Sequence, residues 1–288
     1  PEKLQGISPY FLANNRNQRC IMVDMKAPAG LEVVRRLASR ADVLIENHKP
    51  GAMARLGLGY QDVKALKSDV IYCSCSAYGQ DGPGRDLPGQ DLLLQARTGL
   101  AGLTGRGDGP PIPVGAYVID AYTSMFMVVG ILSALRHRDA TGQGQWIQAD
   151  MMSCTLHMMA QEAAYSLNVR PRPERSTFGI AHVDQPAPYG VYQTADGHVV
   201  ISGWGVESVM KAAEALGVLE ELRPYLSERG LREHRDSVAA GLARGLKRLS
   251  TREAMDRLAG TGMVGLAPVR TLPEALEDPI VGHAGLIK

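Results

Sequence analysis

A glycine-bearing segment ends in a carboxylate at the start of a long apolar run. Residues 114–120 read Val-Gly-Ala-Tyr-Val-Ile-Asp, and the apolar run continues to about Arg138. One interpretation makes Asp120 the N-cap of a helix, where its side chain accepts hydrogen bonds from free N–H groups. The other interpretation is chemical. A helix N-terminus stabilises an anion and lowers the pKa of a carboxyl group, and an ionised carboxylate held in place attacks acyl groups as a nucleophile.

Other kinds of catalytic site find little support. The chain contains no Walker, HExxH or GxSxG pattern, which argues against phosphate-loop, zinc-protease and serine-hydrolase chemistry. The histidines are dispersed, and Cys73 and Cys75 are too close together for the common zinc or redox spacing. We therefore expect no metal and no bound cofactor.

The composition excludes several classes of protein. In 288 residues, 31 Lys and Arg balance 30 Asp and Glu, so the formal net charge is +1 and a broad nucleic-acid-binding surface is not expected. No uninterrupted apolar stretch approaches the ~20 residues of a membrane span, because Gly130 and Ser133 interrupt the longest one. Four cysteines without a disulfide pattern indicate a reducing, cytoplasmic location.

Hydrophobic periodicity places Asp120 after an alternation of strands and helices. The alternation predicts an α/β fold with a parallel sheet, in which strands at 19–24, 42–46 and 70–75 are separated by helices at 29–41 and 60–66. Further elements are expected as a helix at 91–100, a helix from just after Asp120 to near Arg138, a strand at 145–149 and a helix at 151–167.

The composition changes after this region. Pro, Arg and Ser are frequent between Arg170 and Gln185, which is typical of a linker. Residues 191–201 then predict a β-hairpin around Asp196-Gly197, followed by helices up to Leu258 and a last strand at 263–269. We expect a large domain at 1–168, a linker at 169–186, a small domain at 187–270 and a returning segment at 271–288.

Several sequence blocks occur in an order that identifies a family. They are residues 14–19 with 23–26, residues 46–51 with 55–60, residues 115–120 with 130–135 and 141–145, and residues 187–192 with 196–197. In this order the chain resembles the class III CoA-transferases of the CaiB–BaiF type over nearly its whole length. The resemblance implies a Rossmann-like large domain, a smaller α+β domain and an interlocked homodimer. It also implies that a first β-α unit precedes Pro1 and that a return to the large domain follows Lys288.

The resemblance gives Asp120 a catalytic role. In this family the matching aspartate attacks an acyl-CoA thioester and forms a mixed anhydride. Free CoA then forms an aspartyl-CoA thioester, from which an acceptor carboxylic acid collects the CoA. Coenzyme A enters as a co-substrate, and the other partner is a small carboxylic acid.

The same resemblance suggests which residues bind ligands. For CoA they are Val23, Asp24, Met25, Lys26, Asn47, His48, Lys49, Arg55, Leu87, Pro88, Gly89 and Gln90. The first seven lie at the ends of predicted strands, where α/β folds bind ligands. The candidate substrate-binding residues are Tyr10, Asp91 and His182. Each also has a plainer interpretation: Tyr10 as a packed aromatic ring, Asp91 as a helix cap and His182 as a surface histidine.

Two other functions remain open. Related α-methylacyl-CoA racemases move an α-proton with a His–Asp pair. This chain has no histidine between His48 and His137, and it has Gln193 near the position of a glutamate that the racemases carry, so transfer is favoured. The other alternative is a non-catalytic CoA-binding protein.

Overall fold

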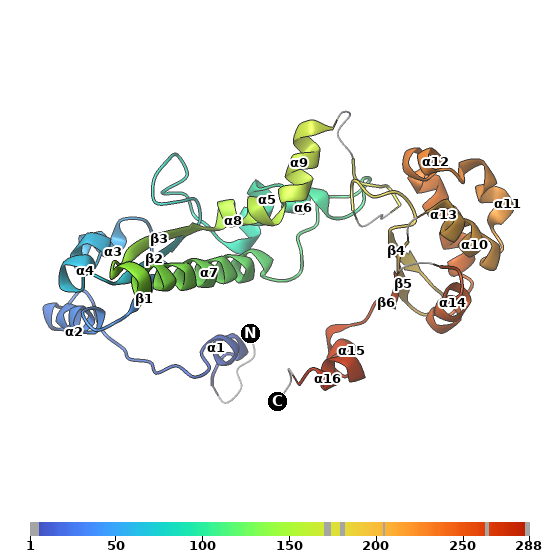
Figure 1. Ribbon diagram of the computed structural model, residues 1–288. Helices are drawn as coiled ribbons and strands as arrows, with labels where there is room; N and C mark the ends of the chain where they lie inside the picture. The colour runs from blue at the N-terminus through green and yellow to red at the C-terminus, as the bar shows by residue number, and fades with distance from the viewer. Residues whose placement is uncertain (1–5, 170–173, 179–181, 204, 263–264, 286–288) are drawn as a thin grey trace. The chain divides into compact units, whose positions relative to one another are not determined.

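A computed structural model describes residues 6–169, 174–178, 182–203, 205–262 and 265–285 (Figure 1). The chain forms two compact units. One consists of residues 1–89 and 123–151, and the other of residues 90–122 and 152–288. The units therefore interleave along the sequence, whereas the predicted domains follow each other. The predicted boundaries stay a prediction, and their linker lies partly outside the described residues.

The first unit is built on a parallel sheet. Its strands are β1 (Val43–Glu46), β2 (Ile71–Ser76) and β3 (Gln145–Asp150), in the order β1-β2-β3. All six residues of β2 are buried, as expected for an apolar central strand of a parallel sheet. The predicted α/β class is confirmed, and the segments after β1 and β2 leave the same edge of the sheet.

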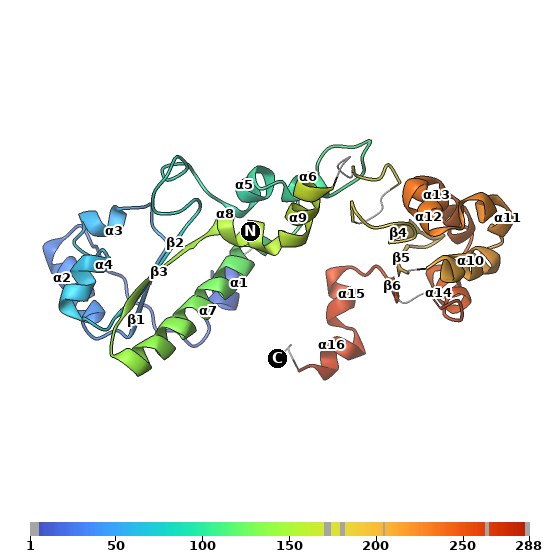
Figure 2. The ribbon, with the colours of Figure 1, turned by 45° about the horizontal axis from the view of Figure 1, so that its top comes forward.

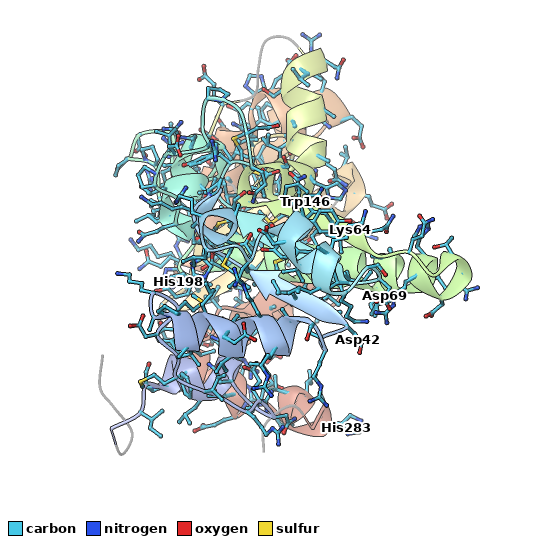
Figure 3. All side chains as sticks on the ribbon, turned by 90° about the vertical axis from the view of Figure 1, so that its left-hand side faces the viewer. Asp42, Lys64, Asp69, Trp146, His198 and His283 are labelled. Atoms are coloured by element: carbon cyan, nitrogen blue, oxygen red, sulfur yellow. The ribbon has the colours of Figure 1, made fainter. Side chains whose placement is uncertain are left out.

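Helices α2 (Pro28–Ala38) and α4 (Tyr60–Leu66) pack on this sheet. The buried Tyr72 hydroxyl donates to the carbonyl of Leu58 at 2.9 Å. Trp146, labelled in Figure 3, stacks on Tyr60 with ring centroids 5.5 Å apart, and its indole N–H donates to Ser74 Oγ at 3.0 Å. The short helices α1 (Pro9–Asn14) and α3 (Ala52–Arg55) belong to the same unit.

The strand predicted at 19–24 is absent. These residues form no regular element, and Ile21 and Met22 are 64% and 101% exposed. A strand needs a neighbour that pairs with its N–H and C=O groups. Among the described residues the parallel sheet contains only β1, β2 and β3, and residues 19–24 pair with none of these strands.

The long helix α7 (Val118–Thr141) begins before Asp120, not after it. Asp120 lies in the first turn, so its prediction as the N-cap is wrong. Further along, Gly130 lets α7 approach β3, because a Cβ there would lie 3.1 Å from Ile147 (Figures 1 and 2). Near the C-terminal end, Arg138 pairs with Asp42 at 3.1 Å and with Asp69 at 3.8 Å.

Helix α7 is also more hydrophobic than the sequence pattern suggested. Its most apolar 18-residue window has a mean hydropathy of 1.8, so by length and composition alone it would cross a membrane. The interruptions at Gly130 and Ser133 do not lower this mean enough to exclude a span. A core helix of a water-soluble protein meets the same criterion, so the observation does not assign a location.

In the second unit the elements are shorter than predicted. The helix expected at 91–100 is divided into α5 (Asp91–Arg97) and α6 (Leu100–Leu103), because Gly99 adopts a left-handed φ of +89°. The helix expected at 151–167 is divided at Met159 into α8 (Met151–Met158) and α9 (Ala160–Asn168).

The rest of the second unit contains an antiparallel sheet covered by helices. Strands β4 (Gly190–Gln193), β5 (His198–Ser202) and β6 (Gly265–Pro268) pair in the order β4-β5-β6, which confirms the predicted hairpin. The helical elements are α10 (Val206–Ala215), α11 (Leu219–Leu222), η1 (Arg223–Tyr225), α12 (Glu228–Glu233), α13 (Arg235–Leu246), α14 (Thr251–Leu258), α15 (Leu272–Leu276) and α16 (Pro279–His283). Most of α10–α14 shares one buried apolar core with the sheet.

The hairpin turn is tied to α14. The carboxylate of Asp196 accepts hydrogen bonds from the backbone N–H of Thr251 at 2.7 Å and from its hydroxyl at 2.9 Å. These two bonds lower the pKa of Asp196 below its ordinary value. The hairpin is therefore anchored to the core that α14 helps to form.

The core of this unit makes a first prediction. Leu242 is fully buried, so Leu242→Ala should lower the free energy of unfolding by about 2–5 kcal/mol through lost burial and a cavity. Leu272→Ala is the control, because Leu272 is 72% exposed. Urea denaturation followed by circular dichroism measures both, and equal losses would contradict the assigned core.

Candidate active site

The first turn of α7 is held by a carboxylate from another helix. One oxygen of Asp91, Oδ2, accepts the backbone N–H of Ile119 at 2.8 Å and that of Asp120 at 3.2 Å. Asp91 is the first residue of α5 and is only 4% exposed. The structure therefore brings two predicted site residues together, with Asp91 as the cap and Asp120 as the capped residue.

Gln95 extends this contact to the segment before α7. Its side-chain amide donates to Asp91 Oδ1 at 2.6 Å, and its carbonyl oxygen accepts the backbone N–H of Val114 at 2.8 Å. Gln95 is 2% exposed. Sequence reasoning missed this residue, although its spacing of four from Asp91 on a helix is the signal that would have paired them.

The electrostatics of Asp120 differ from the expectation. A helix N-terminus alone lowers the pKa of a carboxyl group, but the pKa of Asp120 is raised, first by partial burial and second by the negative charge of Asp91. The first-turn N–H groups of Ile119 and Asp120 point to Asp91 instead. The predicted lowering is therefore wrong, and the Asp120 carboxylate is more basic than that of an ordinary aspartate.

A second polar contact lies on the next turn of α7. The Tyr122 hydroxyl and His157 Nδ1 on α8 are 2.9 Å apart, with ring centroids 6.4 Å apart. Both residues were missed in the sequence, since nothing in the spacing of residues 35 positions apart indicates a contact. The pair links the start of α7 to α8 within the second unit.

The predicted CoA-binding residues lie mainly in the first unit. The segment at 23–26 turns tightly, with the Lys26 N–H donating to Asp24 Oδ1 at 2.9 Å. It also lies against α2, because a Cβ on Gly30 would come within 2.1 Å of the Asp24 carbonyl oxygen. Any larger residue at position 30 would displace this segment.

After β1, the predicted residues Asn47, His48 and Lys49 are exposed at the carboxyl end of the strand. The His48 N–H donates to the Glu46 carboxylate at 2.9 Å, which fixes the path of the chain there. Ligands of α/β folds bind at this edge of a parallel sheet, and the role of these three residues toward CoA stays a prediction.

Two guanidinium groups approach the turn that follows. A Cβ on Gly51 would lie 2.9 Å from Arg85 Nη2 and 3.4 Å from Arg55 Nη1. Arg85 also donates to the Pro50 carbonyl at 3.4 Å, while Gly51 has a left-handed φ of +78°. Arg85 was missed because it is a single basic residue in a loop rich in Gly, Pro and Asp. Together the two arginines form a cationic site suited to phosphate.

The remaining predicted residues have no common location. An exposed segment just before α5 contains Leu87, Pro88, Gly89 and Gln90. Within it, the Pro88 carbonyl accepts a hydrogen bond from the Tyr78 hydroxyl at 3.4 Å. Tyr10 is 59% exposed on α1. Their roles toward substrate stay predictions.

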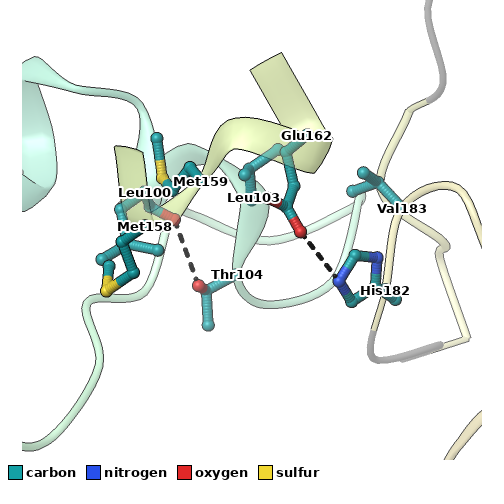
Figure 4. A pocket seen from close by; sticks show the side chains of 8 residues that line it. All are labelled: Leu100, Leu103, Thr104, Met158, Met159, Glu162, His182 and Val183. Carbon is teal, nitrogen blue, oxygen red and sulfur yellow. Dashed lines mark hydrogen bonds and ion pairs between the residues drawn. The ribbon is translucent and has the colours of Figure 1, made fainter. Parts of the chain in front are cut away.

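His182 lines a pocket of about 240 Å³ in the second unit (Figure 4). The apolar part of its wall comes from Leu100, Leu103, Met158, Met159 and Val183. His182 Nε2 lies 3.1 Å from a carboxylate oxygen of Glu162, and its Nδ1 contacts the carboxylate of Asp184. Since both ring nitrogens already face carboxylates, this arrangement favours a structural role over binding of an acceptor acid.

Neither the Cys73 thiol nor one glycine pattern supports a different active site. Burial raises the pKa of the Cys73 thiol to about 11, so it stays protonated at neutral pH. Residues 260–265 have the spacing GxGxxG, but this pattern begins after α14 and ends at the first residue of β6, the reverse of the strand–loop–helix order of a dinucleotide site. Among the described residues, no three His, Cys, Asp or Glu side chains gather as metal ligands.

The raised pKa of Asp120 makes a prediction about stability. The folded protein binds a proton at Asp120 more tightly than the unfolded chain does, so ionisation of this group destabilises the fold as pH rises above the ordinary value of 3.8. Asp120→Asn should therefore raise the melting temperature at pH 7, and the gain should disappear toward pH 3.

The control for this prediction is an aspartate whose pKa is shifted in the opposite direction. Asp108 pairs with Arg106 at 2.9 Å, and that pairing lowers its pKa. Asp108→Asn should leave the melting temperature at pH 7 unchanged or lower it. Thermal denaturation at several pH values measures both variants, and a melting temperature that Asp120→Asn leaves unchanged at every pH would contradict the raised pKa.

The sequence of this chain matches a known protein family. The model of CoA-transferase family III matches residues 1–288. The chain is 30% identical over 282 residues to succinyl-CoA:glutarate CoA-transferase from Mus musculus, covering 97% of this chain and 64% of that protein. It is 32% identical over 280 residues to succinate–glutarate CoA-transferase from Agrobacterium fabrum, covering 96% and 69%.

A solved structure gives the same result for the fold. A CAIB/BAIF family protein from Brucella suis superposes with a TM-score of 0.85 and 31% identity, over 99% of this chain and 75% of that one. The chain thus spans about two thirds of the length of the curated relatives named above. With the family model matched from end to end and the fold shared, this chain belongs to CoA-transferase family III.

Proposed function

We propose that the protein transfers CoA from an acyl-CoA to a carboxylic acid, with Asp120 as the nucleophile. The observation that supports this most is the state of Asp120, an exposed carboxylate in the first turn of α7 with a raised pKa. An accessible, basic carboxylate is what attack on a thioester needs. Membership of the family and relatives named as CoA-transferases support the same reaction.

The proposed reaction needs neither a net proton transfer nor a redox step. The Asp120 carboxylate attacks the thioester carbonyl, the C–S bond breaks, and CoA leaves as a thiolate while a mixed anhydride forms. The thiolate attacks the aspartyl carbonyl and releases the donor acid. The acceptor carboxylate then repeats the two steps in reverse and leaves as its CoA thioester, which restores the Asp120 carboxylate.

The CoA phosphates are proposed to bind at the carboxyl edge of the parallel sheet. Arg55 and Arg85 both approach Gly51 at this edge. Lys49 lies in the bend just before Pro50, and Lys26 lies in the turn at 25–26. Two guanidinium groups near one turn repel each other, so an anion between them is favourable. The overall charge of +1 fits a protein that meets its anionic ligand with a few placed cations.

Short dicarboxylic acids are the proposed donor and acceptor class. The two curated relatives are named for succinyl-CoA or succinate and for glutarate. A screen of dicarboxylates and carnitine-like acids against several acyl-CoA donors tests this class. Exchange with carnitine-like acids alone would contradict it.

The nucleophile is tested by trapping. With an acyl-CoA donor, the wild-type protein should form a species at Asp120 that hydroxylamine converts to a hydroxamate, detected by peptide mass spectrometry. Asp120→Ala should abolish both the label and CoA exchange, a loss of at least about 10⁴-fold, while CoA still binds. Asp108→Asn is the matched control, because this exposed carboxylate lies in the segment before α7 and should leave exchange unchanged.

Each alternative function gives a different result. Unchanged turnover in Asp120→Ala would contradict the mechanism. Deuterium incorporation at the α-carbon without CoA exchange would indicate a racemase. Binding of CoA with neither reaction would indicate a non-catalytic CoA-binding protein.

We further propose a homodimer in the cytoplasm, as the family resemblance implies. One face of α7 carries four exposed apolar residues, as their spacing shows. They are Met125 (62% exposed), Val128 (47%), Val129 (59%) and Leu132 (61%). Such a stripe is typical of a surface that another polypeptide covers. Light scattering should give the mass of two chains, and Leu132→Glu should shift it toward one; a monomeric wild type would contradict the dimer.

A further inference from the structure

The residue before helix α7 is of a type that seldom caps a helix. Tyr117 precedes the first helical residue and so occupies the N-cap position. Ser, Thr, Asp and Asn are preferred there because a short side chain accepts the N–H of the second or third helical residue. The tyrosine has no oxygen at that reach, so the first turn of α7 needs an acceptor from elsewhere.

Asp91 supplies this acceptor from α5. The second and third helical residues are Ile119 and Asp120, and Asp91 Oδ2 accepts both of their N–H groups. Asp91 thus does for α7, from another helix, what an N-cap side chain ordinarily does for its own helix.

Gln95 makes the cap rigid. It bridges Asp91 and the main chain of Val114, so the segment at 114–118 and the first turn of α7 are held against one buried side-chain pair. Asp91 and Gln95 are 4% and 2% exposed. Buried hydrogen bonds to a charged group are strong, and their geometry is well defined.

We propose that Asp91, held by Gln95, is a positioning residue for the nucleophile Asp120. It caps the first turn of α7 and fixes the backbone that carries Asp120 toward the acyl group. This inference rests on the proposed function of Asp120. The nearby negative charge of Asp91 acts in the same direction, since it makes the Asp120 carboxylate more basic.

The test exchanges the charge and the amide between the two buried positions. In Asp91→Asn the new amide faces the donor amide of Gln95, so Gln95 cannot keep its contacts to position 91 and to Val114 at once. In the double variant D91N/Q95E the carboxylate at position 95 accepts from both the amide at position 91 and the Val114 N–H. The network is thereby restored with the same net charge.

The readout is the single-turnover rate at which an acyl-CoA labels Asp120, together with CoA affinity and melting temperature. Asp91→Asn should slow labelling about 100-fold, the size of effect expected for a small misplacement of a reacting group, with CoA affinity within about twofold of wild type. The double variant should recover at least about tenfold of that loss, because it restores the same contacts. Glu253→Gln is the matched control, because it removes the acidic member of a capping box on α14 and should lower only the melting temperature.

The possible failures are distinguishable. Wild-type labelling in Asp91→Asn overturns the positioning role and leaves the proposed function intact. A double variant that recovers its melting temperature but not its labelling rate also overturns it. A wild-type protein in which Asp120 is never labelled overturns the proposed function, and the positioning role with it.

Discussion

The hydrogen bonds from the first turn of α7 to Asp91 determine where the proposed nucleophile, Asp120, is held. They connect two helices whose starting residues are 27 positions apart in the sequence, and they fix the backbone from which Asp120 projects. A buried carboxylate is costly unless its oxygens are satisfied. Gln95 and the two N–H groups satisfy those of Asp91, so the arrangement is stable only when all of its members are present.

This arrangement separates two roles that a helix N-terminus often combines. The dipole and the free N–H groups of a helix can stabilise an anion, and an anion stabilised in this way is a weaker nucleophile. Here two of those N–H groups are directed to Asp91, and Asp120 keeps a raised pKa. The oxyanions of the proposed reaction therefore need donors other than the N–H groups of Ile119 and Asp120.

The sequence predicted the regular parts of this fold well. The apolar runs at 42–46 and 70–75, the helix at 60–66 and the hairpin around Asp196 all correspond to observed elements, because each is specified by a local pattern of hydrophobic and turn residues. The strand at 19–24 failed for the opposite reason. Whether an apolar segment becomes a strand depends on a neighbouring strand, and no local pattern shows whether one is present.

The sequence indicated which residues belong to the candidate site, but not which of them contact each other. Asp120 and Asp91 were both identified from the sequence. However, one interpretation made Asp120 the cap of its own helix, whereas Asp91 accepts the N–H groups of that helix's first turn. Reading the cap from the nearest acidic residue assumes that a helix is capped by its own chain neighbours. Tyr117 breaks that assumption here, and only the three-dimensional contact shows which of the two carboxylates caps the helix.

The segment from Arg85 to Asp91 runs from the first unit into the second. Arg85 belongs to the cationic turn beside Gly51, and Asp91, six residues later, caps the helix that carries Asp120. Between them lie Leu87, Pro88, Gly89 and Gln90, which the family resemblance assigns to CoA. Under the proposed function, one short segment therefore has a proposed phosphate ligand at its start and the residue that positions the proposed nucleophile at its end.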